Sequence, residues 1–225
     1  MFTLQVVSNL FLDCSATSGN FRPRAPYLAI VGNLGPLASK ETAKFLARIS
    51  TEYKKIFIVP SPREHYFIPE CPQPVRFFRD VKDIYFLDRQ SFLTPKVEII
   101  GVTQWPLRSN ELGRLYKSVN PLTPWTDEDD VKEAERDMEY LISKLRNSQP
   151  DVSRILLSYA PPPHFYDIHG RVHIPEYWRG LLVEANVKHW VFGMPASFSH
   201  LKSSSTEIQG PDYRKSPTFN EVITL

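Results

Sequence analysis

Short runs of apolar and β-branched residues recur along the chain, and each is followed by a turn rich in polar residues, glycine or proline. The first run contains Leu4, Val6 and Val7 and ends at Ser8 and Asn9. Runs of this length that are bounded by turn residues are typical of buried strands. By the same criterion we expect strands at 27–31, 55–59, 84–87, 97–100, 155–157, 188–192 and 222–225.

A helix is expected between the second and third of these runs. Ser39 is a suitable N-cap. The apolar positions that follow it lie three or four residues apart, which is helical spacing, and are Ala43, Leu46, Ile49 and Tyr53. A strand, a helix and a strand with short connections form a βαβ unit, whose two strands are parallel. The pattern therefore predicts an α/β fold.

The clearest helical pattern begins after Thr126. Thr126 and Asp129 have the spacing of a capping box, and residues 127–130 are all acidic, which suits the positive end of a helix dipole. The predicted inward face of this helix consists of Val131, Ala134, Met138, Leu141, Ile142 and Leu145. A further helix is expected at 176–185, and 101–125 is expected to be a long irregular loop.

Composition places the chain among soluble globular proteins and narrows its partners. Its 225 residues fit one domain, 1–225, with 42% hydrophobic and 23% charged residues. Twenty prolines against nine glycines leave few positions where backbone amides could closely cradle a phosphate. The net charge of +2 and the lack of a long Lys/Arg run argue against a nucleic-acid patch.

Cysteine content and hydropathy indicate an intracellular protein. The two cysteines, Cys14 and Cys71, are expected to be free thiols in a reducing compartment. Residues 1–20 lack a basic segment followed by an unbroken apolar stretch, so no signal peptide is expected. No window approaches 18 apolar residues, so no transmembrane segment is expected either.

The turns after the predicted strands resemble, in order, the metal-binding motifs of the calcineurin-like metallophosphoesterases. The segment 7–12 reads Val-Ser-Asn-Leu-Phe-Leu, where the family has Val-Ser-Asp-Leu-His-Leu, so Asn9 and Phe11 stand for the ligands Asp and His. In the family's Gly-Asp motif the glycine is kept, and Asn33 replaces the bridging Asp. Segment 58–64 resembles the Val-Pro-Gly-Asn-His-Glu motif, with Pro62 for the ligand Asn and Arg63 for the catalytic His.

The resemblance continues through the second half of the chain. Segment 157–161 is similar to Thr-His-His-Ala-Pro, with Ser158 at the ligand position. Segment 190–196 is similar to Trp-Val-Phe-Gly-His-Thr-His, with Met194 and Ala196 in place of both histidines. Segments 86–105 and 209–225 resemble further stretches of one subgroup, so the likeness covers nearly the full chain.

This resemblance implies that the chain has the family's fold but does not bind the family's two metal ions. The fold would be a four-layer α/β sandwich of two mixed β-sheets flanked by helices. The family's two metals, about 3.5–4 Å apart, need carboxylate and imidazole ligands. Here Asn9, Asn33 and Ser158 offer only neutral oxygens, and Arg63 adds a positive charge. We therefore expect no catalytic residue, no metal ligand and no cofactor at these positions.

A kept fold with every ligand motif altered favours a structural role. We expect a catalytically inactive metallophosphoesterase-like protein that acts as a scaffolding subunit of a larger protein complex. That complex could be organellar, viral or another machine.

Two alternatives assign the chain an active or binding site. The first is a phosphoesterase with a rebuilt metal site, using Asp13, Glu64 or the loop that contains His164, His169 and His173. For these histidines an exposed polar loop is favoured, because their spacing fits no familiar zinc pattern. The second is a module that binds a nucleotide or phosphate without hydrolysing it.

Two further groups of residues allow more than one interpretation. For Arg63, Glu64 and His65, a surface salt-bridge cluster is favoured over a phosphate site or an acid–base role. The aromatic residues Trp105, Tyr116 and Trp125 belong either to a protein interface or to the core.

Overall fold

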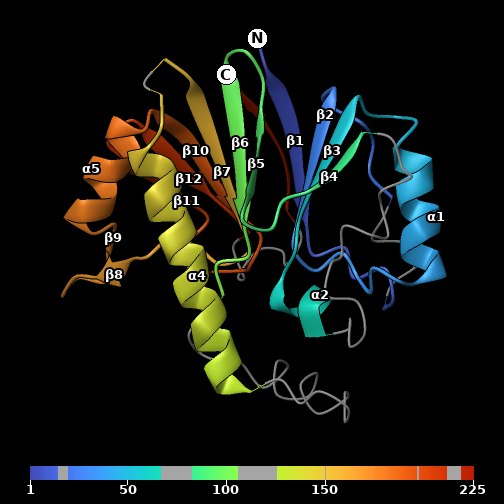
Figure 1. The fold of residues 1–225 in the computed structure, drawn as a ribbon, viewed down its shortest axis with the longest axis horizontal. Helices are drawn as coiled ribbons and strands as arrows, with labels where there is room; N and C mark the ends of the chain where they lie inside the picture. The colour runs from blue at the N-terminus through green and yellow to red at the C-terminus, as the bar shows by residue number, and fades with distance from the viewer. Residues whose placement is uncertain (15–19, 67–82, 106–125, 150, 197, 212–218) are drawn as a thin grey trace.

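A computed structural model describes residues 1–14, 20–66, 83–105, 126–149, 151–196, 198–211 and 219–225. In this part of the chain two β-sheets pack face to face, with helices on both outer faces (Figure 1). The predicted four-layer α/β sandwich of two mixed sheets is therefore confirmed.

The first sheet has the strand order β13-β1-β2-β3-β4. Its strands are β1 (Thr3–Ser8), β2 (Tyr27–Val31), β3 (Lys55–Val59), β4 (Ile84–Phe86) and β13 (Phe219–Thr224). The strands β1 to β4 are mutually parallel, and β13 pairs antiparallel with β1 at one edge.

The second sheet has the strand order β11-β12-β10-β7-β6-β5. Its strands are β5 (Gln90–Leu93), β6 (Val97–Val102), β7 (Ser153–Ser158), β10 (Val187–Phe192), β11 (His200–Ser203) and β12 (Thr206–Gln209). The inner strands are parallel, and both edge strands are antiparallel to their neighbours. A separate pair, β8 (Phe165–Tyr166) and β9 (Val172–His173), forms a short hairpin.

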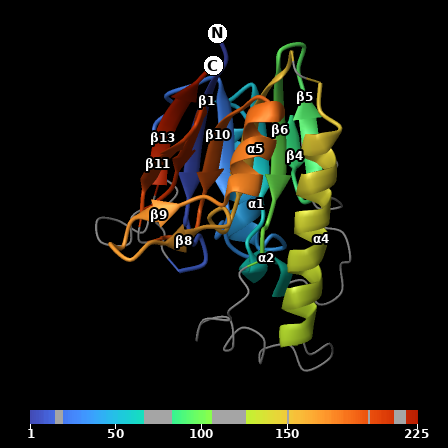
Figure 2. The ribbon, with the colours of Figure 1, turned by 90° about the vertical axis from the view of Figure 1, so that its left-hand side faces the viewer.

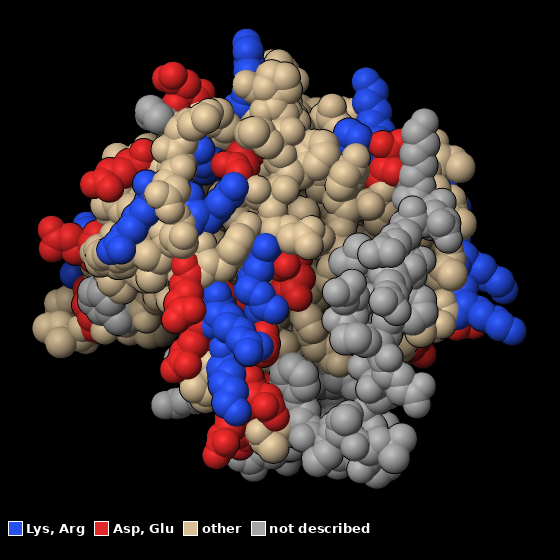
Figure 3. Space-filling model, viewed as in Figure 1, with Lys and Arg blue, Asp and Glu red and all other residues tan. Residues whose placement is uncertain are grey.

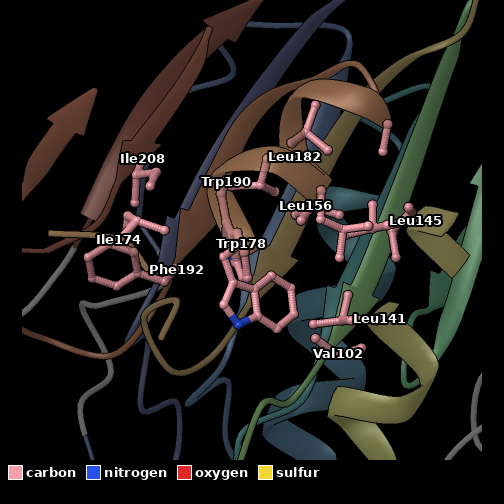
Figure 4. Packing of buried hydrophobic residues seen from close by; sticks show 14 of the residues in the cluster. Val102, Leu141, Leu145, Leu156, Ile174, Trp178, Leu182, Trp190, Phe192 and Ile208 are labelled. Atoms are coloured by element: carbon pink, nitrogen blue, oxygen red, sulfur yellow. The ribbon is translucent and has the colours of Figure 1, made fainter. Parts of the chain in front are cut away.

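Three hydrophobic cores separate the four layers. One lies between the first sheet and α1 (Lys40–Ile49), and a second lies between the two sheets. The third packs the second sheet against α4 (Asp127–Arg146) and α5 (Glu176–Glu184). Figure 4 shows this third core, in which the indoles of Trp178 and Trp190 meet edge to face with ring centroids 5.8 Å apart. Because the strands are covered on both faces, they read as continuous apolar runs rather than alternating ones.

The predicted helices are present, but the faces they bury differ from expectation. Ser39 caps α1 by accepting a hydrogen bond from the Thr42 backbone, and Thr126 and Asp129 form the expected capping box of α4. In α1, Ala43 is exposed, and the buried residues are Thr42, Phe45, Leu46 and Ile49. Tyr53 is buried but lies beyond the end of α1.

The inward face of α4 was predicted wrongly at one end. Val131 is 41% exposed, whereas Asp130 and Asp137 are buried. Both acidic residues lie on the side of α4 that faces the protein, where the hydrophobic pattern alone gave no reason to place them. Met138 and Ile142 are only half-buried.

Several short elements were not predicted. These are α2 (Pro62–Tyr66) and the strands β5, β8, β9, β11 and β12. These strands are two to four residues long, so their sequences lack a sustained apolar run. All except β12 lie at a sheet edge or in the hairpin. The predicted loop at 101–125 begins within β6, and residues 106–125, which include Tyr116 and Trp125, lie outside the described residues. Cys71 lies outside them as well.

None of the helices described here combines the length and the apolar character needed to cross a membrane.

Candidate functional site

The turns that carry the altered motifs meet at one end of the sandwich. They follow β1, β2, β3, β7 and β10, which run parallel to one another within each sheet. Backbone hydrogen bonds join these turns: the Gly32 amide donates to the Val59 carbonyl at 2.8 Å, and the Asn9 amide donates to the Gly32 carbonyl at 3.2 Å. The carboxyl ends of parallel strands are where α/β folds bind ligands.

Two glycines allow the two sheets to approach at this end. A Cβ on Gly193 would lie 1.8 Å from the Val31 carbonyl oxygen, so no larger residue fits between β2 and β10. Gly32 has a φ of 74°, and a Cβ there would lie 2.4 Å from the ring of Tyr159. Both positions therefore require glycine, and both are glycine in the family motifs that the sequence resembles.

Asn9 and Asn33 lie at the centre of the site and are bonded to each other. Both have left-handed backbones, with φ values of 59° and 53°, a conformation that asparagine tolerates better than most residues. The Asn33 side-chain amide donates to Asn9 Oδ1 at 2.7 Å, and Asn9 Nδ2 donates to the Gly193 carbonyl at 2.9 Å. The two side chains thus tie the first sheet to the second.

Ser61 and Glu64 complete this network from the third turn. Glu64 is 1% exposed, and its carboxylate accepts from the backbone amides of Ser61, Asn33 and Gly35 at 2.7, 3.2 and 3.1 Å. The Ser61 hydroxyl lies 2.9 Å from Asn33 Oδ1 and 2.6 Å from Glu64 Oε2. Three backbone donors satisfy the buried charge of Glu64, which explains how the carboxylate is accommodated there.

Arg63 packs beside the network and not on the surface. Its side chain is 6% exposed, it forms an ion pair with Asp13, and its guanidinium lies over the Phe11 ring at 5.3 Å from the centroid. The predicted surface salt-bridge cluster of Arg63, Glu64 and His65 is therefore wrong. A cation–π contact occupies the pair of positions at which the family's motifs have two histidines.

The remaining positions of the altered motifs have structural contacts. Pro62 is the first residue of α2, a position at which proline is well tolerated. The Ser158 hydroxyl donates to the Ala160 carbonyl at 2.6 Å and accepts from the Trp190 indole at 2.8 Å. The Met194 amide donates to the Tyr159 carbonyl at 2.7 Å, and the Ala196 amide donates to the Pro211 carbonyl at 3.1 Å.

A second buried polar network lies next to this site and was not foreseen from the sequence. Arg89, after β4, donates to Asp137 at 2.8 Å and to Glu133 at 2.7 Å, both on α4. Asp137 also accepts from the Gln104 backbone amide at 2.6 Å. Burial raises the pKa of Asp137 to about 7, although Arg89 opposes the shift. The network anchors α4 to the ends of β4 and β6.

His65 is partly buried at this end. Its Nε2 lies 3.3 Å from the Thr103 hydroxyl, and its ring packs on Trp105 with centroids 5.1 Å apart. Burial lowers the pKa of His65, while Asp88 acts in the opposite direction. Trp105 is 3% exposed, so of its two possible roles the core role is the correct one.

The three histidines of the β8–β9 region do not converge. The His164 ring packs on Phe198, the His169 backbone donates to Asp167, and His173 Nε2 lies 3.1 Å from Asp167. Hydrogen bonds, the largest of them from the Arg171 backbone, lower the pKa of Asp167 to about 2. Asp167 therefore organises a polar hairpin loop, as the favoured interpretation expected.

The side chains at the altered motifs do not fit a pair of divalent metals. The chemistry of the donor set decides this, because Zn, Mn and Fe sites are built from anionic and imidazole ligands. Asn9, Asn33 and Ser158 supply only neutral oxygens, and their side chains are already hydrogen-bonded to one another or to the backbone. Among the described residues, no group of three or more His, Cys, Asp and Glu side chains is arranged to hold a metal ion.

The roles of Ser61 and Glu64 could have been recognised from the sequence. Ser61-Pro62-Arg63-Glu64 has the Ser-x-x-Glu spacing of a capping box, with proline at the first helical position. That pattern predicts a helix start at 62, which is where α2 begins. Asp137 carries no comparable local signal, because its partners Arg89 and Gln104 are distant in sequence.

Comparison with solved structures supports the architecture over nearly the whole chain. Phosphopantetheinyl hydrolase from Mycobacterium tuberculosis matches 97% of this chain and 95% of its own, with a TM-score of 0.58 and 13% identity. A Thermus thermophilus protein matches 94% of this chain and 89% of its own, with a TM-score of 0.58 and 14% identity. These values indicate a shared fold.

Sequence comparison finds a viral relative. A protein of Acanthamoeba polyphaga mimivirus is 27% identical in a 155-residue alignment, and the match covers 60% of this chain. The match spans 55% of that relative's length. No model of a known protein family matches the sequence.

Proposed function

We propose that this chain, which has the calcineurin-like metallophosphoesterase fold, is a catalytically inactive protein that works as a scaffolding subunit of a larger protein assembly. The observation that carries the proposal is the hydrogen-bond network of Asn9, Asn33, Ser61 and Glu64. It joins the turns where the family's motifs place metal ligands, and it does so through hydrogen bonds within the chain.

The network supports inactivity because its polar groups are already engaged. Asn33 Nδ2 is directed to Asn9, Asn9 Nδ2 to the Gly193 carbonyl, and the Glu64 carboxylate to three backbone amides. Asn9 and Asn33 are 1% and 7% exposed. Binding a metal here would require breaking buried hydrogen bonds, and each unsatisfied buried group costs about 1–3 kcal/mol.

The electrostatics at Arg63 also oppose a divalent cation. The buried guanidinium of Arg63 lies against Phe11 and pairs with Asp13. Asp13 is therefore neutralised by an internal cation, and so it does not serve the rebuilt metal site considered from the sequence. A second cation nearby would be repelled by Arg63 in a medium of reduced dielectric constant.

The features of the fold that the chain retains support a scaffolding role. The three hydrophobic cores are present, and Gly32 and Gly193 allow the sheets to approach at the altered end. A fold that is maintained without its catalytic groups presents a rigid surface, and a rigid surface is what a subunit of a protein assembly needs. Other proteins are accordingly the proposed partners.

Metal content and hydrolysis measured on one preparation test the proposal. We expect elemental analysis of purified chain, incubated with Mn²⁺, Zn²⁺ and Fe²⁺ and then desalted, to give well below one metal per chain. We expect no hydrolysis of p-nitrophenyl phosphate or bis-p-nitrophenyl phosphate above a buffer control. One or two tightly bound metals per chain together with turnover would overturn the proposal.

Variants separate a rebuilt site from a contaminating enzyme. If hydrolysis is detected, it should be measured again in His164→Ala and His169→Ala. Loss of activity in either variant would establish an enzyme that uses the histidine loop. A nucleotide-binding module would instead show a rise in Tm with ATP or AMP and no product.

A further inference from the structure

A groove of about 960 Å³ runs between α4 and the segment Pro161–Pro163 that follows β7. Its α4 wall is formed by Val131, Ala134, Met138 and Ile142, with Glu135 and Glu139 beside them. Met194 also lines it, so the groove reaches the turn after β10. Most of the lining side chains are apolar.

The α4 wall has the spacing of a helix-binding face. Val131, Glu135, Met138 and Ile142 lie three or four residues apart and extend over about 16 Å, since a helix rises about 1.5 Å per residue. Figures 1 and 2 show that the N-terminal half of α4 projects beyond the ends of the strands, so no sheet covers it. This accounts for the 41% exposure of Val131, which the hydrophobic pattern predicted to face inward. The apolar stripe of α4 therefore extends along the helix beyond the third core.

The charged side chains that line the groove are acidic, as far as the structure describes them. Between Asp127 and Glu139 the sequence holds eight acidic residues and two basic ones, and none of the Lys and Arg residues that the structure describes lines the groove. Figure 3 shows Asp and Glu side chains along both flanks of α4, on either side of a stripe of Lys and Arg. Favourable interaction with the helix dipole explains acidic residues in the first turn only, so it does not account for Glu135 and Glu139.

We infer that this groove is the docking site for a helical segment of a partner protein that has an apolar face flanked by Lys or Arg. The apolar floor would bury the hydrophobic side chains of an amphipathic helix, and Glu135 and Glu139 would pair with its basic residues. The same two carboxylates repel phosphate and nucleotides. The inference rests on the proposed scaffolding role, because it names the chemistry of the partner.

Two synthetic peptides of opposite charge test the inference. Both are fluorescently labelled 14-residue helices with leucine at helical spacing, one flanked by Lys and the other by Glu at the same positions. Anisotropy titrations at physiological salt should show the Lys peptide binding at least about tenfold more tightly. The overall charge of the protein is +2, so a general attraction for cationic peptides does not produce this preference.

Charge reversal in the groove provides the decisive variant. The double variant Glu135→Lys and Glu139→Lys should reverse the preference, so that the Glu peptide binds more tightly. Both residues are exposed, which makes the substitutions compatible with folding. The matched control is Glu41→Lys with Glu184→Lys, two exposed positions on α1 and α5, and it should keep the preference of the unmodified chain. Val131→Asn should weaken both peptides, because it removes apolar contact area.

Three outcomes would overturn the inference. Equal affinity for the two peptides would remove the charge argument, and an unchanged preference in the Glu135/Glu139 variant would place binding elsewhere. Sedimentation that shows a dimer lost on Val131→Asn would identify a second copy of this chain as the occupant. Any of these results from a metal-free, inactive protein leaves the proposed function standing, whereas metal-dependent hydrolysis overturns that function whatever the peptides do.

Discussion

At the scale of single residues, the side-chain amide of Asn33 allows hydrogen bonds to hold the altered site together. Its Nδ2 donates to Asn9 Oδ1 at 2.7 Å, and its backbone amide lies 3.2 Å from the Glu64 carboxylate. Asparagine supplies a donor that aspartate lacks. An aspartate there is compatible with a metal-bound site but not with this network.

Asn33→Asp should therefore destabilise the protein at neutral pH. The new carboxylate would face Asn9 Oδ1 without a donor and would lie close to Glu64, which costs about 2–4 kcal/mol. Part of the loss should be recovered near pH 5, because burial and Glu64 raise the pKa of the new carboxyl and its protonated form can again donate. Urea unfolding at both pH values measures this effect.

Asn20→Asp is the matched control for that substitution. Asn20 is exposed, so the same chemical change should leave the urea midpoint nearly unaltered. Equal midpoints for Asn33→Asp and the unmodified chain at pH 7 would contradict the role assigned to the network.

Ser158 gives a second prediction at this scale. Its hydroxyl accepts the indole hydrogen of the fully buried Trp190 at 2.8 Å and donates to the Ala160 carbonyl. Ser158→Ala leaves that indole without its acceptor, and we expect the free energy of unfolding to fall by about 1–3 kcal/mol. Ser143→Ala on the exposed face of α4 serves as the control and should be neutral or slightly stabilising. The two variants can be compared by thermal unfolding.

At the scale of elements, α4 is held to the sheets by two different means. Its C-terminal half packs Leu141 and Leu145 into the third core. Its middle is fixed by Asp137, which contacts Arg89 after β4 and the Gln104 amide after β6. The polar anchor leaves the adjacent apolar face of α4 available to form the groove.

The anchor should make stability depend on pH in a direction unusual for an acidic residue. Burial raises the pKa of Asp137 from 3.8 to about 7. Between those values the unfolded chain releases a proton that the folded chain retains, so Asp137 lowers the free energy of unfolding as pH rises. The full effect is at most about 4 kcal/mol.

Asp137→Asn should remove this dependence. We expect the variant to lose less stability than the unmodified chain as the pH is raised from 4 to 7 in urea titrations. Asp151→Asn, at an exposed position, should follow the unmodified chain. Parallel pH profiles for Asp137→Asn and the unmodified chain would refute the titration of this carboxyl.

At the scale of the whole molecule, stability should be independent of metals. The turns at the altered end are joined by hydrogen bonds among Asn9, Asn33, Ser61 and Glu64, and the proposed function requires no metal ion to hold these turns together. We expect the same Tm, within about 1 °C, with EDTA and with Mn²⁺ or Zn²⁺, because a ligand that does not bind the native state does not shift unfolding. A rise in Tm with metal that EDTA reverses would contradict this.

Sequence reasoning recovered the parts of the fold that local patterns determine. Uninterrupted apolar runs located β2 and β3 to the residue, and capping residues located the starts of α1 and α4. It also identified the turns that hold Asn9, Asn33 and Ser158. The short strands β11 and β12 were missed, because polar residues interrupt their apolar positions.

What sequence reasoning missed depends on contacts between distant residues. Arg63 and Glu64 look like surface charges until α2 places them under the turns after β1 and β2. Val131 looks like a core residue until α4 is seen to extend past the strands. Neither property is encoded in a window of neighbouring residues.

The antiparallel pairing of β13 with β1 has a practical consequence for experiments. The amide of Phe2 donates to the Leu225 carbonyl and the amide of Leu225 to the Phe2 carbonyl, both at 2.9 Å. Figures 1 and 2 place both ends of the chain at the pole of the sandwich opposite α2. A tag or surface linker attached at either end therefore leaves from the pole opposite the altered turns. Immobilised in this way, the chain presents its groove to solvent, and a short linker between residues 225 and 2 would suffice for circular permutation.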